Sequence, residues 1–263
     1  MNTDLTGRRA IVCGSTQGLG LATARELALL GAGVILMARN EQKLAEVVKS
    51  LDVSKGQNHE YIVADFQNTE AVKRAIEQYL ADNKRAIHIL VNNTGGPKPG
   101  SMGDAKEEDF LQAFNSHLIC NHILVQAVLP LMKLAGFGRI VNIISTSVKQ
   151  PIHGLAVSNT IRAAVAGWSK TLANEVGRFG ITVNNVLPGY TRTQRYHSIV
   201  KNKAIASQKK EEEIELDILA EIPLGRIGTP EEFGAVAAFL CTPASAYISG
   251  INLPVDGGKL ACL

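Results

Sequence analysis

The sequence predicts an α/β fold, in which one domain spanning residues 1–263 carries a doubly wound, seven-stranded parallel sheet flanked by helices. Short apolar runs alternate along the chain with longer segments whose apolar residues recur every three or four positions. The short runs are apolar on both strand faces, a pattern typical of parallel strands that helices cover on both sides. In such a sheet, ligands bind beyond the carboxyl ends of the strands, so we expect functional residues directly after each strand.

Strand-sized and helical segments follow one another in a regular order. The strand-sized runs are RAIVCG, AGVILMA, EYIVAD, IHILVNN, GRIVNII, GITVNNVLP and GINLPVDGG. The helical segments cover residues 19–30, 41–53, 69–81, 107–135 and 155–177. Because a helix that joins two parallel strands forms a right-handed crossover, this order predicts repeated βα units in a single sheet.

A charged segment, residues 191–222, interrupts the alternation between the sixth strand and the last helix. Its sequence, TRTQRYHSIVKNKAIASQKKEEEIELDILAEI, predicts a long helical insertion. The run KKEEEIELD is typical of a solvated helix face. Because the insertion follows a strand at the expected ligand edge, its position also favours a mobile lid or substrate loop.

The composition is that of an ordinary globular protein, with 46% hydrophobic and 19% charged residues. A formal net charge of +3, with scattered basic residues, gives no sign of binding to nucleic acid or to a membrane surface. The most apolar long run, residues 118–132, is interrupted by Asn121, His122 and Gln126, which a bilayer would penalise. We therefore expect neither a membrane span nor a nucleic-acid partner.

The four cysteines are far apart and form no CxxC pair. Such isolated cysteines are typical of reduced thiols in the cytosol rather than of disulfides or zinc ligands. The start of the chain also runs from polar residues directly into a strand, without the apolar stretch of a signal peptide. The sequence thus predicts a cytoplasmic protein without a metal site. The cysteines are Cys13, Cys120, Cys241 and Cys262.

A glycine-rich turn, CGSTQGLG at residues 13–20, follows the first strand and opens the first helix. Missing side chains let the backbone approach a pyrophosphate, and the helix N-terminus offers unpaired N–H groups and a positive dipole. This context favours a dinucleotide-binding turn of the Rossmann type over a plain tight turn. The expected cofactor contacts here are Gly14, Ser15, Thr16, Gln17, Gly18, Leu19 and Gly20.

The order and spacing of further motifs resemble those of the short-chain dehydrogenase/reductase family over almost the whole chain. The family glycine motif is usually TGxxxGxG, and here Cys13 replaces its threonine. NNTG corresponds to the family NNAG after the fourth strand, and PGYTRT to the loop beside the nicotinamide. Asp65 corresponds to the aspartate that contacts the adenine. The resemblance implies cofactor contacts from Asp65, Phe66, Asn92, Asn93, Thr94, Gly95, Pro188, Gly189, Thr191 and Thr193.

The end of the second strand predicts which nicotinamide cofactor is bound. NAD-preferring enzymes carry an acidic residue there for the ribose hydroxyls, whereas this chain has Ala38 followed by Arg39. An acid would repel a 2′-phosphate, and an arginine can hold one with its planar, permanently charged fork. We therefore expect NADP(H), with Arg39 on the 2′-phosphate.

Members of the family usually carry four catalytic residues, Asn, Ser, Tyr and Lys, of which Tyr and Lys form a YxxxK motif on one helix face. This chain keeps only two of the four. The resemblance assigns Asn115, in FNSHL, and Ser145, in NIISTS, to the first two. The register set by RAAVAG and by Ser145 puts Ser158 at the Tyr position and Arg162 at the Lys position. A serine hydroxyl is a much weaker acid than a phenol, and arginine stays charged, so this pair cannot copy the usual proton transfer. Arg162 can still hold the ribose or an anion of the substrate.

Three interpretations follow from this replacement. In the first, another group donates the proton to a reduced carbonyl, and Lys149, four residues after Ser145, is the preferred candidate. The alternatives, in loops that we expect to border the pocket, are His153, Tyr190 and Tyr196. In the second, the enzyme reduces a C=C bond conjugated to a carbonyl, whose oxygen then needs mainly hydrogen bonds. In the third, the chain binds NADP(H) without turnover. The nearly complete cofactor motifs favour a reductase.

The resemblance extends to the 3-oxoacyl-(acyl carrier protein) reductases of the family, which implies a small carbonyl substrate of the 3-oxoacyl type. The loop at 191–222 would line the substrate pocket, as the corresponding variable loop does in the family. The family also implies a homotetramer or homodimer, built from the long helices at 107–135 and 155–177 and the C-terminal strand.

Overall fold

The computed structural model describes residues 1–262 and contains one seven-stranded sheet in which all the paired strands are parallel. The strand order is β3-β2-β1-β4-β5-β6-β7. The chain winds outward from β1 to β3, then crosses back to β4 on the other side of β1 and winds outward to β7. The predicted doubly wound parallel sheet is therefore confirmed. The strands are β1 (Arg9–Cys13), β2 (Gly33–Ala38), β3 (Glu60–Val63), β4 (Ile89–Asn92), β5 (Gly138–Ile143), β6 (Ile181–Pro188) and β7 (Asn252–Val255).

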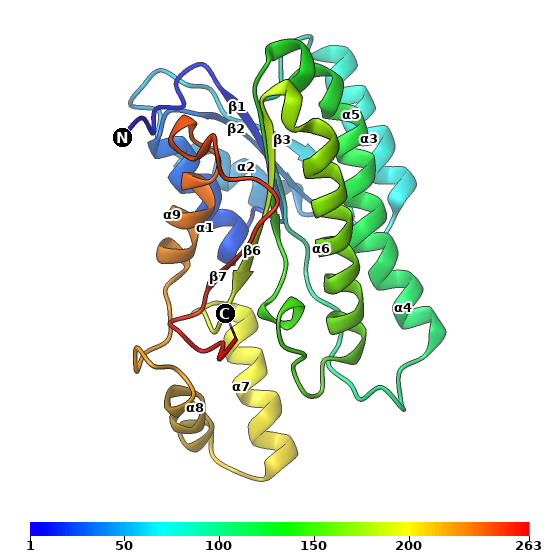
Figure 1. Cartoon of the computed structure of the whole chain (residues 1–263), viewed down its shortest axis with the longest axis vertical. Helices are drawn as coiled ribbons and strands as arrows, with labels where there is room; N and C mark the ends of the chain where they lie inside the picture. Colours follow the sequence, from blue (N-terminus) through cyan, green and yellow to red (C-terminus); the bar gives the residue numbers. More distant parts are fainter. Residues whose placement is uncertain (263) are drawn as a thin grey trace.

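Helices cover both faces of the sheet (Figure 1). One face is covered by α1 (Gly18–Leu29), α2 (Glu41–Ser50) and α9 (Pro230–Phe239). The other face is covered by α3 (Thr69–Asp82), α5 (Cys120–Ala135) and α6 (Ala156–Val176).

The two apolar cores explain why the strands are apolar on both faces. Successive strand residues point to opposite sides, so Val12 packs with the core of α1 and α9, and Ile11 with the core of α3 and α5. Both side chains are fully buried. Burial of an aliphatic side chain of this size stabilises a fold by about 1.5–3 kcal/mol.

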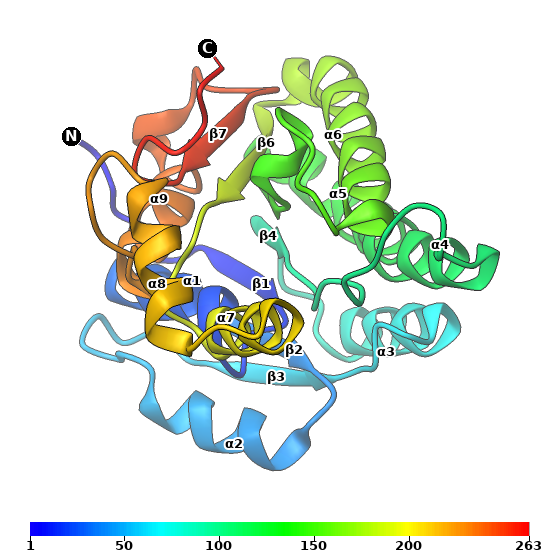
Figure 2. The same cartoon turned by 90° about the horizontal axis from the view of Figure 1, so that it is seen from below.

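The insertion at residues 191–222 forms two helices, where the sequence predicted one helical segment. They are α7 (Gln194–Ser207) and α8 (Glu211–Ala220). Between them Gln208 takes a left-handed φ of 55°, which ends α7 and turns the chain back. Val200 and Ile218 meet in a small apolar cluster between the two helices. This α7–α8 hairpin extends beyond the end of the sheet at which β6 finishes (Figures 1 and 2).

The predicted helix at residues 107–135 is continuous but irregular. It consists of α4 (Glu107–Phe114), a π-helical turn η1 (Asn115–Ile119) and α5. This segment, Glu107–Ala135, is long and apolar enough to cross a membrane by length and composition alone. Leu124 and Val128 are nevertheless fully buried in the core against the sheet. Burial against the sheet accounts for part of this apolar character, since about a third of the most apolar stretch is buried.

Candidate functional site

The glycine-rich turn after β1 brings backbone close to backbone. Gly14 adopts a positive φ of 56°, and a Cβ there would lie 2.7 Å from the carbonyl oxygen of Asn93. A Cβ on Gly20 would collide with the carbonyl oxygen of Gly14. The Asn93 amide fixes this arrangement, because its Nδ2 donates to the carbonyl oxygens of Cys13 and Gly14 at 3.3 and 3.2 Å. Only glycine fits at positions 14 and 20, as a backbone cradle for phosphates requires.

The other residues of the turn connect it to its neighbours. Ser15 is fully buried, and its Oγ accepts a hydrogen bond of 3.1 Å from the backbone N–H of Met37 in β2. Gln17 is the N-cap residue of α1 and its side chain is exposed. Thr16 and Leu19 are partly exposed beside it. The first helical N–H groups therefore lie at the carboxyl edge of the sheet, where a helix N-terminus stabilises anions.

The loop after β6 lies against the glycine turn. A Cβ on Gly18 would lie 3.6 Å from Cγ2 of Thr193, which caps the N-terminus of α7 through a 3.3 Å bond from the Tyr196 N–H. Pro188 is the last residue of β6, and a Cβ on Gly189 would lie 2.5 Å from the Cα of Asp256. Thr191 is buried. The structure thus brings two predicted cofactor motifs, far apart in sequence, side by side.

A chain of asparagine amides connects four neighbouring strands just below this edge. Asn92 in β4 donates to Asn142 in β5 at 2.8 Å, and Asn142 donates to Asn185 in β6 at 3.0 Å. Asn185 in turn donates to Asn252 in β7 at 2.8 Å. Asn92 and Asn142 are almost completely buried. These hydrogen bonds tie the four strands together, although the Oδ1 of Asn92 has no partner among the described residues.

The residues that we predicted to contact the adenosine half lie on the opposite side of the glycine turn. Arg39 follows β2 and is exposed. Asp65 is partly exposed after β3, and its Oδ1 accepts a 3.0 Å bond from the Gln67 N–H. Phe66 packs partly against the core beside α5. Since β2 and β3 are neighbours, their two ends lie at one edge of the sheet.

Ser145 directly follows the end of β5 and begins a short 3₁₀ helix, Thr146–Val148. Its Oγ accepts a 3.1 Å hydrogen bond from the Ser147 N–H, which fixes the hydroxyl at this strand end. Lys149 closes the same turn, since its backbone N–H donates to the Thr146 carbonyl at 3.0 Å. The structure therefore brings Ser145 and Lys149 into one hydrogen-bonded turn.

Asn115 begins the π-helical turn, and its backbone carbonyl accepts a bond from the N–H of Cys120, five residues later. Such turns often mark functional sites. The Asn115 side chain is exposed. In the same turn His117 is buried, and its Nδ1 forms a short hydrogen bond with Oγ1 of Thr94. Burial and the nearby Arg162 lower the pKa of His117 to about 2, so this imidazole is neutral.

Ser158 and Arg162 lie one turn apart on α6. Ser158 is partly exposed in the first turn of the helix. Arg162 is buried with 7% of its surface exposed, and its Nη1 donates to the Ile143 carbonyl at 3.2 Å. Its Nε is also buried and has no hydrogen-bond partner among the described residues. Burial and the nearby Arg195 lower the pKa of Arg162 to about 10. This guanidinium is therefore charged at neutral pH but incompletely hydrogen-bonded.

The alternative proton donors have different surroundings. His153 is exposed after the Ser145 turn. Tyr196 lies within helix α7, so its predicted place in a loop is wrong. Its hydroxyl donates to Glu215 at 3.1 Å, and burial with this hydrogen bond raises its pKa to about 12. The hydroxyl of Tyr190, in the loop before α7, accepts a 3.3 Å hydrogen bond from Lys203 of α7. Tyr196 is thus part of the α7–α8 hairpin, and Tyr190 packs against the hairpin from the loop before it.

Two residues of the site were missed in the sequence analysis. His117 stood inside the quoted motif FNSHL, but nothing local indicated its contact with Thr94. Arg195 was one of several basic residues in the charged insertion, and its Nη2 donates to the Pro97 carbonyl at 3.2 Å in the loop after β4. Both contacts join residues that are far apart in sequence.

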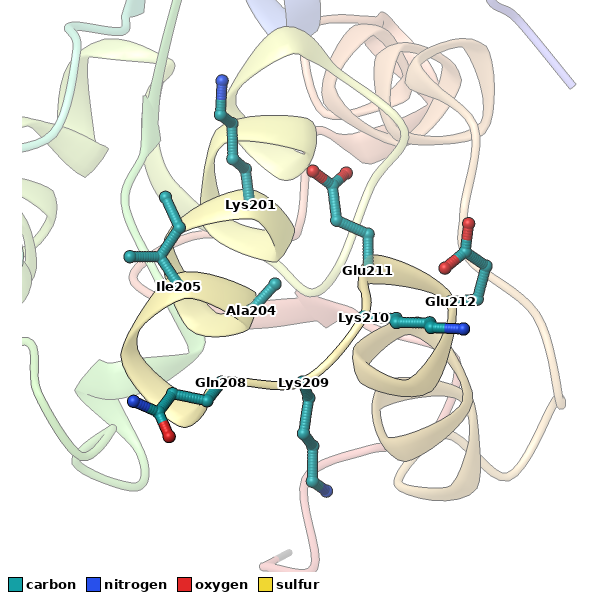
Figure 3. A pocket seen from close by; sticks show the side chains of 8 residues that line it. All are labelled: Lys201, Ala204, Ile205, Gln208, Lys209, Lys210, Glu211 and Glu212. Atoms are coloured by element: carbon teal, nitrogen blue, oxygen red, sulfur yellow. The ribbon is translucent and has the colours of Figure 1, made fainter.

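One pocket lies away from these residues, at the turn of the α7–α8 hairpin (Figure 3). Its volume is about 490 Å³, and charged side chains of both signs surround it. Its lining includes none of the predicted site residues. The lining residues are Lys201, Ala204, Ile205, Gln208, Lys209, Lys210, Glu211 and Glu212. The candidate site is therefore the carboxyl edge of the sheet, with β1, β4, β5, β6 and the start of α6.

Comparisons with known proteins cover almost the whole chain. A family model described as enoyl-(acyl carrier protein) reductase matches residues 14–259. The chain is 34% identical to the 3-oxoacyl-[acyl-carrier-protein] reductase FabG of Rickettsia bellii, over 98% of both chains. It is 29% identical to the NADPH-dependent reductase BacG of Bacillus subtilis, over 97% of this chain and 99% of BacG. The solved structure of L-sorbose reductase from Gluconobacter frateurii, complexed with NADPH and L-sorbose, superposes with a TM-score of 0.92 at 29% identity over 100% of both chains.

Proposed function

The chain belongs to the short-chain dehydrogenase/reductase family, and we propose that it transfers a hydride from NADPH to the carbonyl group of a small substrate. The observation that carries this proposal is the glycine turn, where Gly14 and Gly20 leave room for backbone alone beside the N-terminus of α1. A fold without this cradle would hold no dinucleotide in this orientation. The relatives BacG and L-sorbose reductase are described with NADPH, which supports the same cofactor here.

The residues present fit NADPH. The turn from Gly14 to Gly20 would hold the pyrophosphate, and Arg39 the 2′-phosphate, because no acidic residue follows β2 at this point. Asp65 would contact the adenine. Asn93 to Gly95 and the loop from Pro188 to Thr193 would line the nicotinamide half. The bound cofactor supplies the hydride.

The protein side chains would then act on the substrate oxygen. Ser145, fixed by the Ser147 N–H, would donate a hydrogen bond to that oxygen as negative charge develops on it. Ser158 contributes at most a further hydrogen bond, since its hydroxyl is a weak acid. Lys149, in the same turn as Ser145, would supply the proton. Asn115 would support this arrangement from the π-helical turn.

Fluorescence titration tests the cofactor assignment. NADPH should bind more tightly than NADH, and tighter NADH binding would overturn the role of Arg39. Absorbance at the NADPH band then measures consumption with a panel of ketones, 3-oxoacyl thioesters and enones. A rate above background with ketones supports carbonyl reduction, and binding without consumption of any substrate would contradict it.

Substitution of Lys149 by Ala tests the proton donor. A general acid typically contributes about 10²- to 10⁴-fold to the rate, so the variant should lose kcat by at least 100-fold. Lys201→Ala, which removes the same charge at the distant pocket, is the matched control and should leave kcat unchanged. An unchanged rate in the Lys149 variant would remove this residue from the mechanism.

Reduction of a C=C bond conjugated to a carbonyl is the second candidate function. It is favoured by Ser158 at the position where the family carries its tyrosine acid, and the matching family model is described as an enoyl reductase. In that reaction the hydride goes to carbon, and the oxygen needs mainly the hydrogen bond of Ser145. Nuclear magnetic resonance of the product from an enone distinguishes a saturated ketone from an allylic alcohol.

We also propose that residues 1–263 act as one domain whose α7–α8 hairpin, within residues 191–222, covers the substrate. A homotetramer or homodimer would form through the helices of residues 107–135 and 155–177 and through β7. Leu111 and Phe114 of α4 are exposed apolar residues that such an interface would cover. Light scattering on the purified protein tests the oligomer. The free cysteines of the described chain agree with a reducing cytoplasm.

A further inference from the structure

We propose that Arg162 and Arg195 form a binding site for a carboxylate of the substrate, so that the reduced compound is an oxo acid or an unsaturated acid. This inference rests on the proposed function and adds the chemical class of its substrate. It starts from the surroundings of Arg162, which differ from those of every other buried or paired arginine described below.

Arg139 shows how this fold satisfies a buried arginine whose role is structural. Only 3% of its surface is exposed, and it donates to three backbone carbonyls at 2.8 to 3.2 Å, one of them from its Nε. Arg9, Arg85 and Arg226 instead form ion pairs with glutamates. Arg162 has neither arrangement. In the described part of the chain it has one carbonyl partner and no acidic partner.

The unpaired edge of Arg162 has the geometry that a carboxylate needs. Nη1 is held by the Ile143 carbonyl, whereas Nε has no partner within residues 1–262. Nε and Nη2 form the side of the guanidinium that binds the two oxygens of a carboxylate in parallel. A buried donor without a partner lowers stability, and an incoming oxyanion would remove that penalty.

A second guanidinium converges on the same place. Gly96, in the loop after β4, has no side chain, and a Cβ there would lie 3.9 Å from Nη2 of Arg162 and 3.7 Å from Nη2 of Arg195. Arg195 is exposed in the first turn of α7 and is held by the Pro97 carbonyl. The positive charge of Arg195 disfavours the charge of buried Arg162, and an anion bound between the two groups would remove this repulsion.

Neither Arg162 nor Arg195 forms an ion pair within residues 1–262. His117 is neutral, as its low pKa shows, and Thr94 and Ser158 carry no charge. Since Ser158 lies one turn before Arg162 on α6, the carboxylate would be bound beside the group that undergoes reduction. A cofactor phosphate is the other anion with this chemistry, and the experiment must separate the two.

The test compares two ligands of nearly the same shape, one an anionic carboxylate and the other a neutral amide. Binding of cinnamate and of cinnamamide is measured by calorimetry, to the chain alone and to its complex with NADP⁺. One charge-assisted hydrogen bond contributes about 1.5–3 kcal/mol, so cinnamate should bind about 10- to 100-fold more tightly. Arg195→Gln should reduce this preference at least about fivefold, whereas Arg178→Gln, an exposed arginine just beyond the far end of α6, should retain it.

Gly96→Val provides an independent variant that leaves all charges in place. Its side chain would occupy the space between the two guanidinium groups and should also abolish the preference for cinnamate. Equal affinities for acid and amide in the unmodified protein would overturn the proposal, even if NADPH binds and ketones are reduced. Weaker NADP⁺ binding in Arg195→Gln with an unchanged preference for cinnamate would assign the arginines to the cofactor and also overturn it. Failure of NADPH to bind would instead contradict the proposed function, while the titration of the chain alone still measures the carboxylate site.

Discussion

The glycine turn and the start of α6 specify their functions in opposite ways. The turn works because side chains are missing, and at Gly20 any Cβ would collide with the Gly14 carbonyl. The start of α6 works through the side chains that it presents, here Ser158 and Arg162. A change in the turn therefore removes the cradle, whereas a change on α6 keeps the helix and alters the chemistry. A chain can therefore keep the cofactor motifs of the family while the side chains at the start of α6 change.

The largest effect on NADPH binding is expected for Gly20→Val. Overpacking of this kind costs about 1–3 kcal/mol, and here it would displace the turn that holds the pyrophosphate. NADPH affinity should fall by at least about 100-fold and turnover should be lost. Gly177→Ala, which places a methyl group in open space at the far end of α6, is the control and should leave the titration unchanged. Normal NADPH binding by the Gly20 variant would show that the turn is not the cradle.

Ser145→Ala tests whether a side chain at the substrate end of the site contributes to the rate without contributing to cofactor binding. Loss of one donor to a developing oxyanion typically reduces kcat by about 10²- to 10³-fold. The dissociation constant of NADPH should stay within about twofold, because the cradle is intact. Steady-state kinetics and fluorescence titration measure the two effects. Ser198→Ala on the exposed face of α7 is the matched control, and an equal loss in both variants would refute the role of Ser145.

Arg39→Asp tests a charged side chain within the proposed cofactor site, next to the backbone cradle. A charge-assisted hydrogen bond contributes about 1.5–3 kcal/mol, so NADPH affinity should fall by about 10- to 100-fold. NADH affinity should remain or improve. Arg25→Asp, an exposed arginine on α1, should weaken NADPH binding far less. An equal loss for both cofactors would point to general electrostatics instead of the 2′-phosphate.

The smallest effect is expected for Ser158→Ala. Because a serine hydroxyl is a weak acid, its removal should change kcat for a ketone or an enone by less than about tenfold. Single-turnover measurement of NADPH oxidation checks this directly. A loss comparable to that of Ser145→Ala would mean that Ser158 has taken over the role of the missing tyrosine.

The sequence predicted the sheet and the glycine turn because both depend on local patterns. Helix ends differ by a few residues, and the segment expected at 41–53 ends as a helix at Ser50. The α7–α8 hairpin was predicted as one helical insertion, and Gln208 divides it. In highly charged helices the apolar residues recur too rarely to show where one helix ends and the next begins. The separation of α7 from α8 depends instead on the apolar cluster that Val200 and Ile218 form between them.

By itself, the amino-acid sequence determined the order of βα units, the backbone cradle and the residues at positions 158 and 162. These follow from spacing, from missing side chains and from helix register, which are all local properties. Only the tertiary structure decided that Arg195 and Arg162 both lie beside Gly96, and that His117 binds Thr94. The physical reason is that partners of buried polar groups come from strands and loops far apart in the chain, and packing alone brings them within hydrogen-bond distance.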